Sequence, residues 1–305
     1  MGEQDITERN LEEHNDIFAD IVNAFFLMKG LRGYVVRPEE LQEAKGWSAY
    51  TSSFEESLRE QRRDATKLWV PGAGRGDRAF ISLLGLENQT AIDTYMALRV
   101  FGYEGGDYHW QLTQEGWKLC PVITIVLYFG TEQRWRKNRT LFERLNVSEE
   151  LRPLMNDCRV NVIELAWLTE EEAALCTSDL KIVIDYLRQV RLNKDYVPSA
   201  EVLKHVQETM DLLSELTGDR RFVEVASEFK KGEPVTMVDV LGRIEARGME
   251  NGIAIGEKRG ISIGEKRGLL AVARRMKADG FSAASISKLT GLSIKEIESL
   301  KKAKS

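Results

Sequence analysis

The chain has 305 residues, of which 43% are hydrophobic and 30% are charged, as is typical of a soluble globular protein with one sizeable core. No apolar run reaches the roughly 18 residues that a membrane span needs, and the acidic, polar first residues do not resemble a signal peptide. Three widely spaced cysteines without a CxxC pair indicate free thiols in a reducing compartment. We therefore expect a cytoplasmic protein without a membrane segment.

The charge is distributed unevenly along the chain, whose formal net charge is -5. Residues 242–305 hold 14 Lys and Arg against 7 Asp and Glu, whereas the other residues hold 29 basic and 41 acidic side chains. A basic tail on an acidic body favours contact with a polyanion such as DNA. A solvated, charge-rich tail explains the same counts, and charge alone does not separate the two interpretations.

The first predicted element is a helix over residues 10–28. At 100° per residue, Ile17, Ile21, Phe25 and Met28 share one face of this helix. A polar loop with a proline and a glycine is expected to follow it.

Two short apolar runs, residues 60–70 and 78–87, flank the glycine-rich segment PGAGRGDR and predict a β-hairpin. Residues 92–117 then predict a largely helical segment with a break at EGGD, residues 104–107. The hairpin and the helical segment together place strands and helices in one chain region, which is typical of an α/β fold.

The run PVITIVLYF, residues 121–129, is apolar and rich in β-branched side chains, which predicts a strand covered on both faces. A further strand is expected over residues 160–168, followed by helices near 179–192 and 199–216. The order of elements predicts a mixed α/β core.

We place a domain boundary after residue 235, so that residues 1–235 form the core domain with its helices and residues 236–305 form a helical tail. Glycine recurs every four residues from Gly248 to Gly268 in this tail. Six glycines cost a helix roughly 5–6 kcal/mol relative to alanine, so either a partner chain packs on them or the stretch is a semi-flexible connector.

The last residues of the chain predict two short helices around a turn at Gly291. Such a pair is similar to the latter half of a helix-turn-helix, which binds DNA. The same arrangement also serves in protein–protein packing, and the sequence leaves both interpretations open.

Carboxylates in the predicted hairpin suggest a metal site. Hydrolysis of a phosphodiester needs an activated water and neutralised phosphate charge, and Mg²⁺ held by carboxylates provides both. Asp64 lies early in the first strand and Glu87 at the end of the second, so they are expected roughly opposite each other, with Gln89 on the face of Glu87. Asp16 or Asp20, on the polar side of the first helix, could add a third acid. Asp64 and Glu87 could instead form surface ion pairs, and an acid near the start of a helix such as Asp16 is also favoured by the helix dipole.

Five segments taken in order, HNDIFADIVNAFF, QRRDATKLW, ISLLGLENQT, MALRVFGY and PVITIVLYFG, resemble the Rpn family of recombination-promoting nucleases and putative transposases. That family belongs to the PD-(D/E)XK nuclease superfamily. The resemblance runs from about residue 14 to 198, and the glycine tail with its terminal helices also resembles family members. It implies an α/β fold with a PD-(D/E)XK restriction-endonuclease-like core, a mixed sheet flanked by helices, and a helical C-terminal extension.

The resemblance also implies an activity and its residues. The activity is that of a Mg²⁺-dependent DNA endonuclease of recombination or mobile-element biology, in which Mn²⁺ may substitute for Mg²⁺. Carried over by position, the first acid of the superfamily falls on Asp64, its D/E-x-K motif on residues 87–89, and its helical acid on Asp16 or, as the second choice, Asp20. Asp64, Glu87 and Asp16 are then the metal ligands.

One departure from the superfamily pattern concerns its lysine, which Gln89 replaces. Glutamine donates and accepts hydrogen bonds but carries no positive charge. Family members commonly carry this glutamine, so the replacement does not by itself imply inactivity. It suggests slow chemistry or a cation from elsewhere, such as Arg62, Arg63 or Arg99.

Three further features have competing interpretations. The segment RWRKNR, residues 134–139, is either a phosphate-contacting loop or a solvated basic one. Arg99 and Tyr103 share a helical face at i, i+4 and serve either the site or packing. The three histidines, His14, His109 and His205, are dispersed without ligand spacing, so no zinc site is expected.

Three functions therefore compete. The first is a DNA endonuclease, and the second is a catalytically weak or inactive DNA-binding or transposon-associated protein, which Gln89 favours. The third is a protein-interaction scaffold built around the tail. Under each of them the glycine-rich tail is expected to form homo-oligomers.

Overall fold

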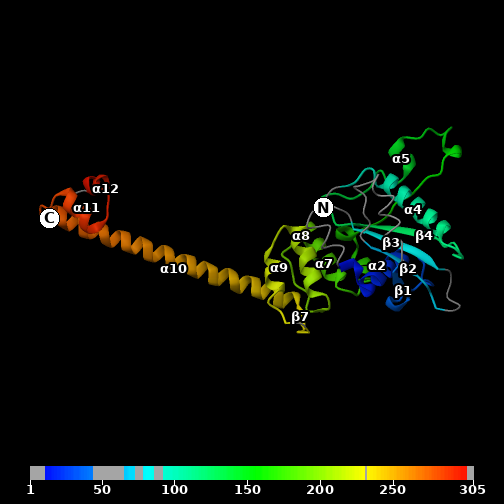
Figure 1. Ribbon diagram of the computed structural model, residues 1–305, viewed down its shortest axis with the longest axis horizontal. Helices are drawn as coiled ribbons and strands as arrows, with labels where there is room; N and C mark the ends of the chain where they lie inside the picture. Colours follow the sequence, from blue (N-terminus) through cyan, green and yellow to red (C-terminus); the bar gives the residue numbers. More distant parts are fainter. Residues whose placement is uncertain (1–10, 44–64, 73–77, 86–91, 231, 301–305) are drawn as a thin grey trace. The chain divides into compact units, whose positions relative to one another are not determined.

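The computed structural model describes residues 11–43, 65–72, 78–85, 92–230 and 232–300. The chain divides into two compact units, Met1–Leu241 and Gly242–Ser305, which are described separately (Figure 1). The division falls inside one helix, α10 (Met237–Ala278). The basic, glycine-rich tail therefore coincides with the second unit.

Unit 1 contains a five-stranded mixed sheet in the order β1-β2-β3-β4-β5. The first three strands are antiparallel neighbours, and β3, β4 and β5 are parallel neighbours. The predicted hairpin and the predicted buried strand are confirmed as β2–β3 and β4, whereas β1 lies in the predicted polar loop. The strands are β1 (Leu41–Glu43), β2 (Ala65–Trp69), β3 (Ala79–Gly85), β4 (Val122–Tyr128) and β5 (Asn161–Glu164).

Helices surround this sheet, and the amphipathic first helix, predicted over residues 10–28, is confirmed as α2. Its residues Ile17, Ile21 and Phe25 are buried, as their common face predicts. The helices of unit 1 before α10 include α2 (Asn15–Met28), α4 (Met96–Thr113), α5 (Leu141–Leu145), α6 (Glu170–Ala173), α7 (Leu180–Arg191), α8 (Val206–Thr217) and α9 (Arg221–Ala226).

Two neighbouring residues of β2 show that α2 and α4 cover opposite faces of the sheet. Trp69 lies with its ring centroid 6.3 Å from that of Phe26 in α2, and Leu68 packs in a cluster with Trp110 of α4. Because consecutive strand residues point to opposite faces, the two helices sandwich the sheet between them (Figure 1).

Three predicted boundaries differ from the structure. Helix α4 continues through residues 104–107 without the expected break, because Asp107 at the end of this segment and Gln111 one turn later are buried. The strand predicted over 160–168 ends at Glu164 and gives way to a 3-10 turn. The helix predicted from residue 199 begins at Val206, after the short strand β6 (Val202–Leu203).

The end of unit 1 extends into the first residues of α10. Strand β7 (Val235–Thr236) pairs with β6, and the Met237 and Val240 side chains directly after it are fully buried. The boundary predicted after residue 235 would remove both side chains from the unit that buries them, so the core retains residues up to Leu241.

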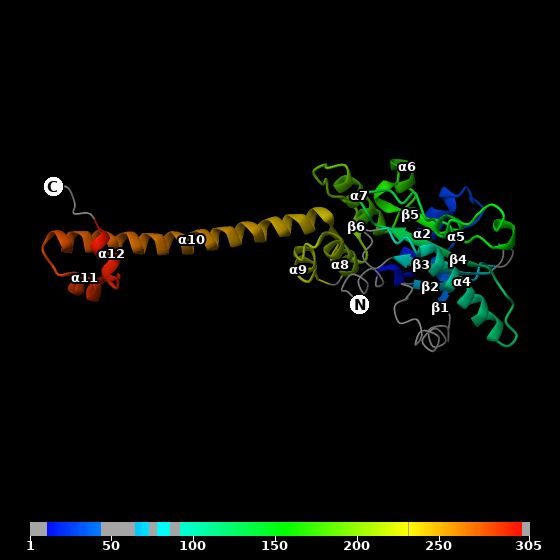
Figure 2. The same cartoon turned by 90° about the horizontal axis from the view of Figure 1, so that it is seen from above.

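Unit 2 consists of the rest of α10 with two short helices at its far end, α11 (Ala283–Thr290) and α12 (Ile294–Ser299). A small core that includes Ala273, Ile286 and Ile297 joins the three helices, and Gly291 adopts the left-handed conformation that the turn between the short helices needs. Figure 2 shows α10 as an unbroken helix that reaches them. Within the described residues, no helix is long and apolar enough to cross a membrane.

A shortened chain tests where unit 1 ends. We expect residues 1–241 to unfold cooperatively, and residues 1–232, which lack β7, Met237 and Val240, to be less stable by roughly 3–6 kcal/mol, since each buried apolar side chain contributes about 1.5–3 kcal/mol. Urea unfolding followed by circular dichroism measures the difference. Equal stability of the two chains would show that β7 and the start of α10 do not belong to the core.

Candidate functional site

The main predicted site residues, Asp64, Glu87 and Gln89, lie outside the described residues. The structure does describe the strands that they adjoin in sequence. Ala65, the first residue of β2, pairs with Leu83 near the end of β3, so the chain enters β2 and leaves β3 at one end of the sheet. Asp64 immediately precedes the first of these strands, and Glu87 follows the second by two residues.

Lys67, in the middle of β2, links this strand to the segment just before α2. Its ammonium group donates a hydrogen bond to the Glu13 carbonyl at 2.9 Å and another to Glu43 of β1 at 3.3 Å. The side chain of Lys67 is 5% exposed, so a buried cation holds these segments together. Lys67 was not predicted as a site residue, although a lysine inside a largely buried strand is a signal that the sequence contains.

Asp16, the predicted helical acid, lies in the first turn of α2 and contacts His205, which directly precedes α8. The ring nitrogen Nε2 of His205 lies 3.0 Å and 3.1 Å from the two carboxylate oxygens. Burial raises the pKa of the Asp16 carboxyl, but the hydrogen bond and electrostatic attraction of His205 outweigh burial and lower that pKa below its ordinary value. Asp16 is therefore ionised at neutral pH.

Asp20, the alternative helical acid, binds protein groups instead. Its carboxylate accepts hydrogen bonds from the backbone N–H groups of Thr177 and Ser178 and from the Thr177 hydroxyl, at 2.9–3.0 Å. These bonds attach α2 to the segment that leads into α7. Asp20 therefore has a structural role in joining α2 to this segment.

The structure brings together two of the histidines that were expected to be dispersed. The rings of His14 and His205 stack with centroids 3.8 Å apart, and His14 Nε2 lies 3.3 Å from Glu208 Oε1 in the first turn of α8. These three side chains offer ligand atoms that all lie within 4.8 Å of one another. No spacing rule reveals the cluster, because His14 and Glu208 are 194 residues apart in the sequence.

Several cations proposed for nucleic-acid contact are engaged within the protein. Arg99 donates hydrogen bonds to Asp93 at 3.0 Å and to Tyr103 at 3.3 Å. In the basic segment 134–139, Arg134 and Arg139 both form ion pairs with Glu164.

Trp135 of that basic segment is fully buried against Tyr128. This tryptophan is therefore not free to pack against a base or a sugar. Arg136 and Lys137 remain exposed, so a phosphate contact by this segment would rest on these two side chains.

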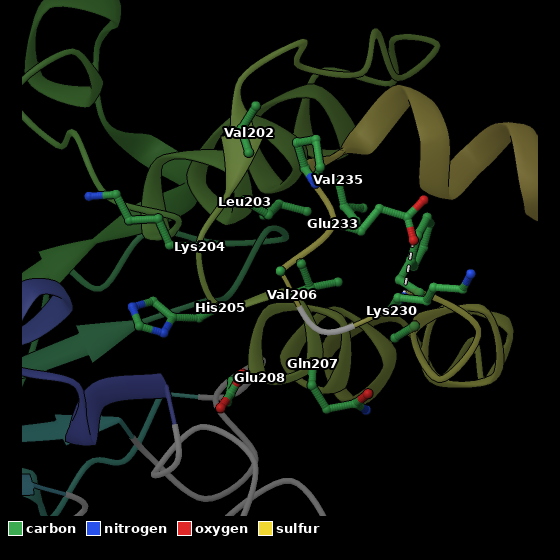
Figure 3. Close-up of a pocket in the computed structure, with 14 residues that line it drawn as sticks. Val202, Leu203, Lys204, His205, Val206, Gln207, Glu208, Lys230, Glu233 and Val235 are labelled. Atoms are coloured by element: carbon green, nitrogen blue, oxygen red, sulfur yellow. Dashed lines mark hydrogen bonds between the residues drawn. The ribbon is translucent and has the colours of Figure 1, made fainter.

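A cavity of about 620 Å³ adjoins the histidine cluster and is lined by residues of β6, α8 and the segment from α9 to β7, including His205, Glu208 and Lys230. Figure 3 shows His205 and Glu208 projecting away from Lys230 and Glu233. Both residues thus lie at one edge of this cavity.

A mixed sheet with helices on both faces and a helical extension defines an α/β protein. Residues 40–219, from just before β1 to just beyond α8, match a family described as putative transposase, YhgA-like. Because the match covers more than half of the chain, the protein belongs to this family. No match is found among curated proteins or among solved structures.

Replacing Asp20 tests its structural assignment. We expect Asp20→Ala to lower the free energy of unfolding by about 1–3 kcal/mol, because two backbone N–H groups lose their acceptor. The exposed Asp195 supplies a matched control, and Asp195→Ala should change stability by less than about 0.5 kcal/mol. An unchanged Asp20→Ala stability would contradict the assignment and return Asp20 to the list of candidate metal ligands.

Proposed function

We propose that the protein is a Mg²⁺-dependent DNA endonuclease of the PD-(D/E)XK type, with Asp64 and Glu87 as its principal metal-binding carboxylates. The observation that carries the proposal is the pairing of Ala65 with Leu83. It brings the entry to β2 and the exit from β3 to one end of the sheet, and the two predicted acids flank these points in the sequence. Membership of a family of putative transposases supports a function in DNA transactions.

The donor set suits the proposed ion. Three carboxylates, Asp64, Glu87 and Asp16, provide the hard oxygen ligands that Mg²⁺ prefers, and Asp16 is ionised and about one-third exposed. When bound, Mg²⁺ lowers the pKa of a water and neutralises phosphate charge. Gln89 donates a hydrogen bond that orients a water or a phosphate oxygen, without the charge of the superfamily's lysine.

The second candidate is a DNA-binding protein with the same fold and little or no turnover. Gln89 favours it, and so does the engagement of two described cations within the protein: Lys67 binds Glu13 and Glu43, and Arg99 binds Asp93. A scaffold built around the tail is the third candidate.

Nicking of supercoiled plasmid by the purified protein, with Mg²⁺, Mn²⁺ or EDTA, separates these candidates. We expect metal-dependent nicking, and Asp64→Ala and Glu87→Ala should each lower it by roughly a hundredfold or more, because several kcal/mol of charge stabilisation is lost. Gln89→Ala should slow nicking without abolishing metal binding.

Asp195→Ala, which changes an exposed aspartate, should nick as the unaltered chain does. Salt-sensitive DNA binding without nicking under any metal would replace the first candidate by the second. Wild-type nicking by either the Asp64 or the Glu87 variant would refute the site.

We also propose that the tail binds DNA phosphates and a second copy of the chain. Its excess of basic residues attracts a polyanion, and such binding weakens steeply with salt. Helix α10 has open space within 4 Å of the position a Cβ would take at each of its glycines, and Ile253, Ile255, Ile261 and Ile263 beside them are at least half exposed. A close-packed helix would cover both.

Two comparisons test the tail. The full chain should bind DNA more tightly than residues 1–241 at about 0.1 M salt, because neutralised phosphates release counterions, and should have a larger mass by light scattering. Gly256→Ala together with Gly264→Ala should stabilise the helix by about 1 kcal/mol per site. The double variant should nevertheless self-associate less, because the added methyl groups hold a partner helix away. Undiminished self-association in this variant would remove the glycines from the contact.

A further inference from the structure

The cluster of His14, His205 and Glu208 lies outside the carboxylate set proposed for Mg²⁺. His14 immediately precedes α2, while His205 and Glu208 belong to the start of α8. Their ligand atoms lie within 4.8 Å of one another, and a tetrahedral ion with bonds of about 2.0–2.2 Å holds its donors about 3.3 Å apart. A small closing movement therefore brings all three onto one ion.

We propose that His14, His205 and Glu208 bind one borderline transition-metal ion, Zn²⁺ in type, with a fourth position open to water. Two imidazole nitrogens and one carboxylate suit Zn²⁺ and disfavour Mg²⁺, which takes oxygen ligands in octahedral geometry. This ion differs from the one proposed for catalysis, although Asp16 serves both sites, as a Mg²⁺ ligand in one and as the hydrogen-bond partner of His205 in the other. Binding of the Zn²⁺-type ion does not require nuclease activity.

His205 is held in place for this role from two sides. Its backbone N–H donates a hydrogen bond to the buried Asp179 carboxylate at 2.6 Å, and its Nε2 contacts Asp16. A carboxylate on one ring nitrogen fixes the tautomer and raises the basicity of the other. Asp16 thus leaves Nδ1 of His205 as the ligand atom and is itself a positioning residue at this site.

The stacking of the two rings predicts a movement on binding. Their planes are 27° apart, and a metal lies in the plane of each ring that binds it, so one ring must turn out of the stack. The side chain of His14 is 35% exposed and that of His205 only 19%. His14 therefore turns, while His205 keeps its contacts with Asp16 and Asp179.

The bound ion would join the start of α2 to the start of α8. Two side-chain contacts already join these starts, Asp16 with His205 at 3.0 Å and His14 with Glu208 at 3.3 Å. Metal bonds would strengthen this junction, because they bridge segments that are far apart in the sequence. The neighbouring cavity, lined in part by His205 and Glu208, admits the ion.

Titration of the full-length protein with Zn²⁺, followed by ¹H–¹⁵N NMR of the histidine rings, tests the proposal directly. The chain has three histidines, so two ring systems should shift together at one equivalent while that of His109 does not. Millimolar Mg²⁺ should leave the rings of His14 and His109 in place and can shift only that of His205, which contacts the proposed Mg²⁺ ligand Asp16. Co²⁺ as a substitute should give visible d–d bands without a thiolate charge-transfer band, which separates the cluster from the three cysteines.

Variants provide the matched controls. His14→Ala and His205→Ala should each weaken Zn²⁺ binding by at least about tenfold, and Glu208→Gln should do the same while preserving side-chain shape. His109→Ala should bind as the unaltered chain does. Thermal melting verifies that each variant is folded, and Zn²⁺ should raise the melting temperature only where the cluster is intact.

Two results would overturn the assignment. One is unmoved His14 and His205 ring signals at stoichiometric Zn²⁺, and the other is undiminished Zn²⁺ affinity in folded Glu208→Gln and His205→Ala. A thiolate charge-transfer band with Co²⁺ would likewise assign the ion to cysteine.

Discussion

Strand β3 pairs antiparallel with β2 on one side and parallel with β4 on the other, and the arrangement of unit 1 depends on this change of direction. The antiparallel side closes through a short hairpin, whereas the parallel side needs a crossover, which α4 supplies. Gly85 at the end of β3 pairs with Leu127 of β4, and Tyr128 pairs with Glu164 of β5. The chain therefore leaves β3, β4 and β5 at the end of the sheet where it enters β2, and the anchor from Lys67 adds the start of α2.

Elements with a long apolar run or a repeating apolar face could be predicted from the sequence, whereas strands of two or three residues could not. The nine apolar residues around β4 and the repeating face of α2 each carry several consistent signals, and both are present. Strands β1, β6 and β7 have only two or three residues each. They form because neighbouring strands offer backbone partners, and no local pattern encodes such a partner.

The candidate site residues likewise differ in whether the sequence alone reveals them. The acids that the family resemblance implies could be named from the sequence, because each lies beside a recognisable strand or helix. Asp16 was named for its place on the polar side of α2. The histidine cluster could not be found, since it forms only when α8 packs beside the start of α2 and brings Glu208 to His14 across 194 residues. Asp16 and Asp20 both precede the midpoint of α2, so the sequence does not show how their surroundings differ. The structure shows that Asp16 contacts His205 and that Asp20 contacts Thr177.

The glycines of α10 impose a geometry on whatever covers them. A period of four residues exceeds the 3.6 of the helix, so each successive glycine turns about 40° further around the axis. From Gly248 to Gly268 the stripe therefore turns by roughly 200°, and a straight neighbouring helix meets only part of it. Apolar periods longer than 3.6 residues favour right-handed wrapping, in contrast to the left-handed supercoil of heptad repeats. A partner helix on this tail would accordingly cross it at a short contact among the exposed isoleucines near Gly256 and Gly264, or wrap it with a right-handed twist.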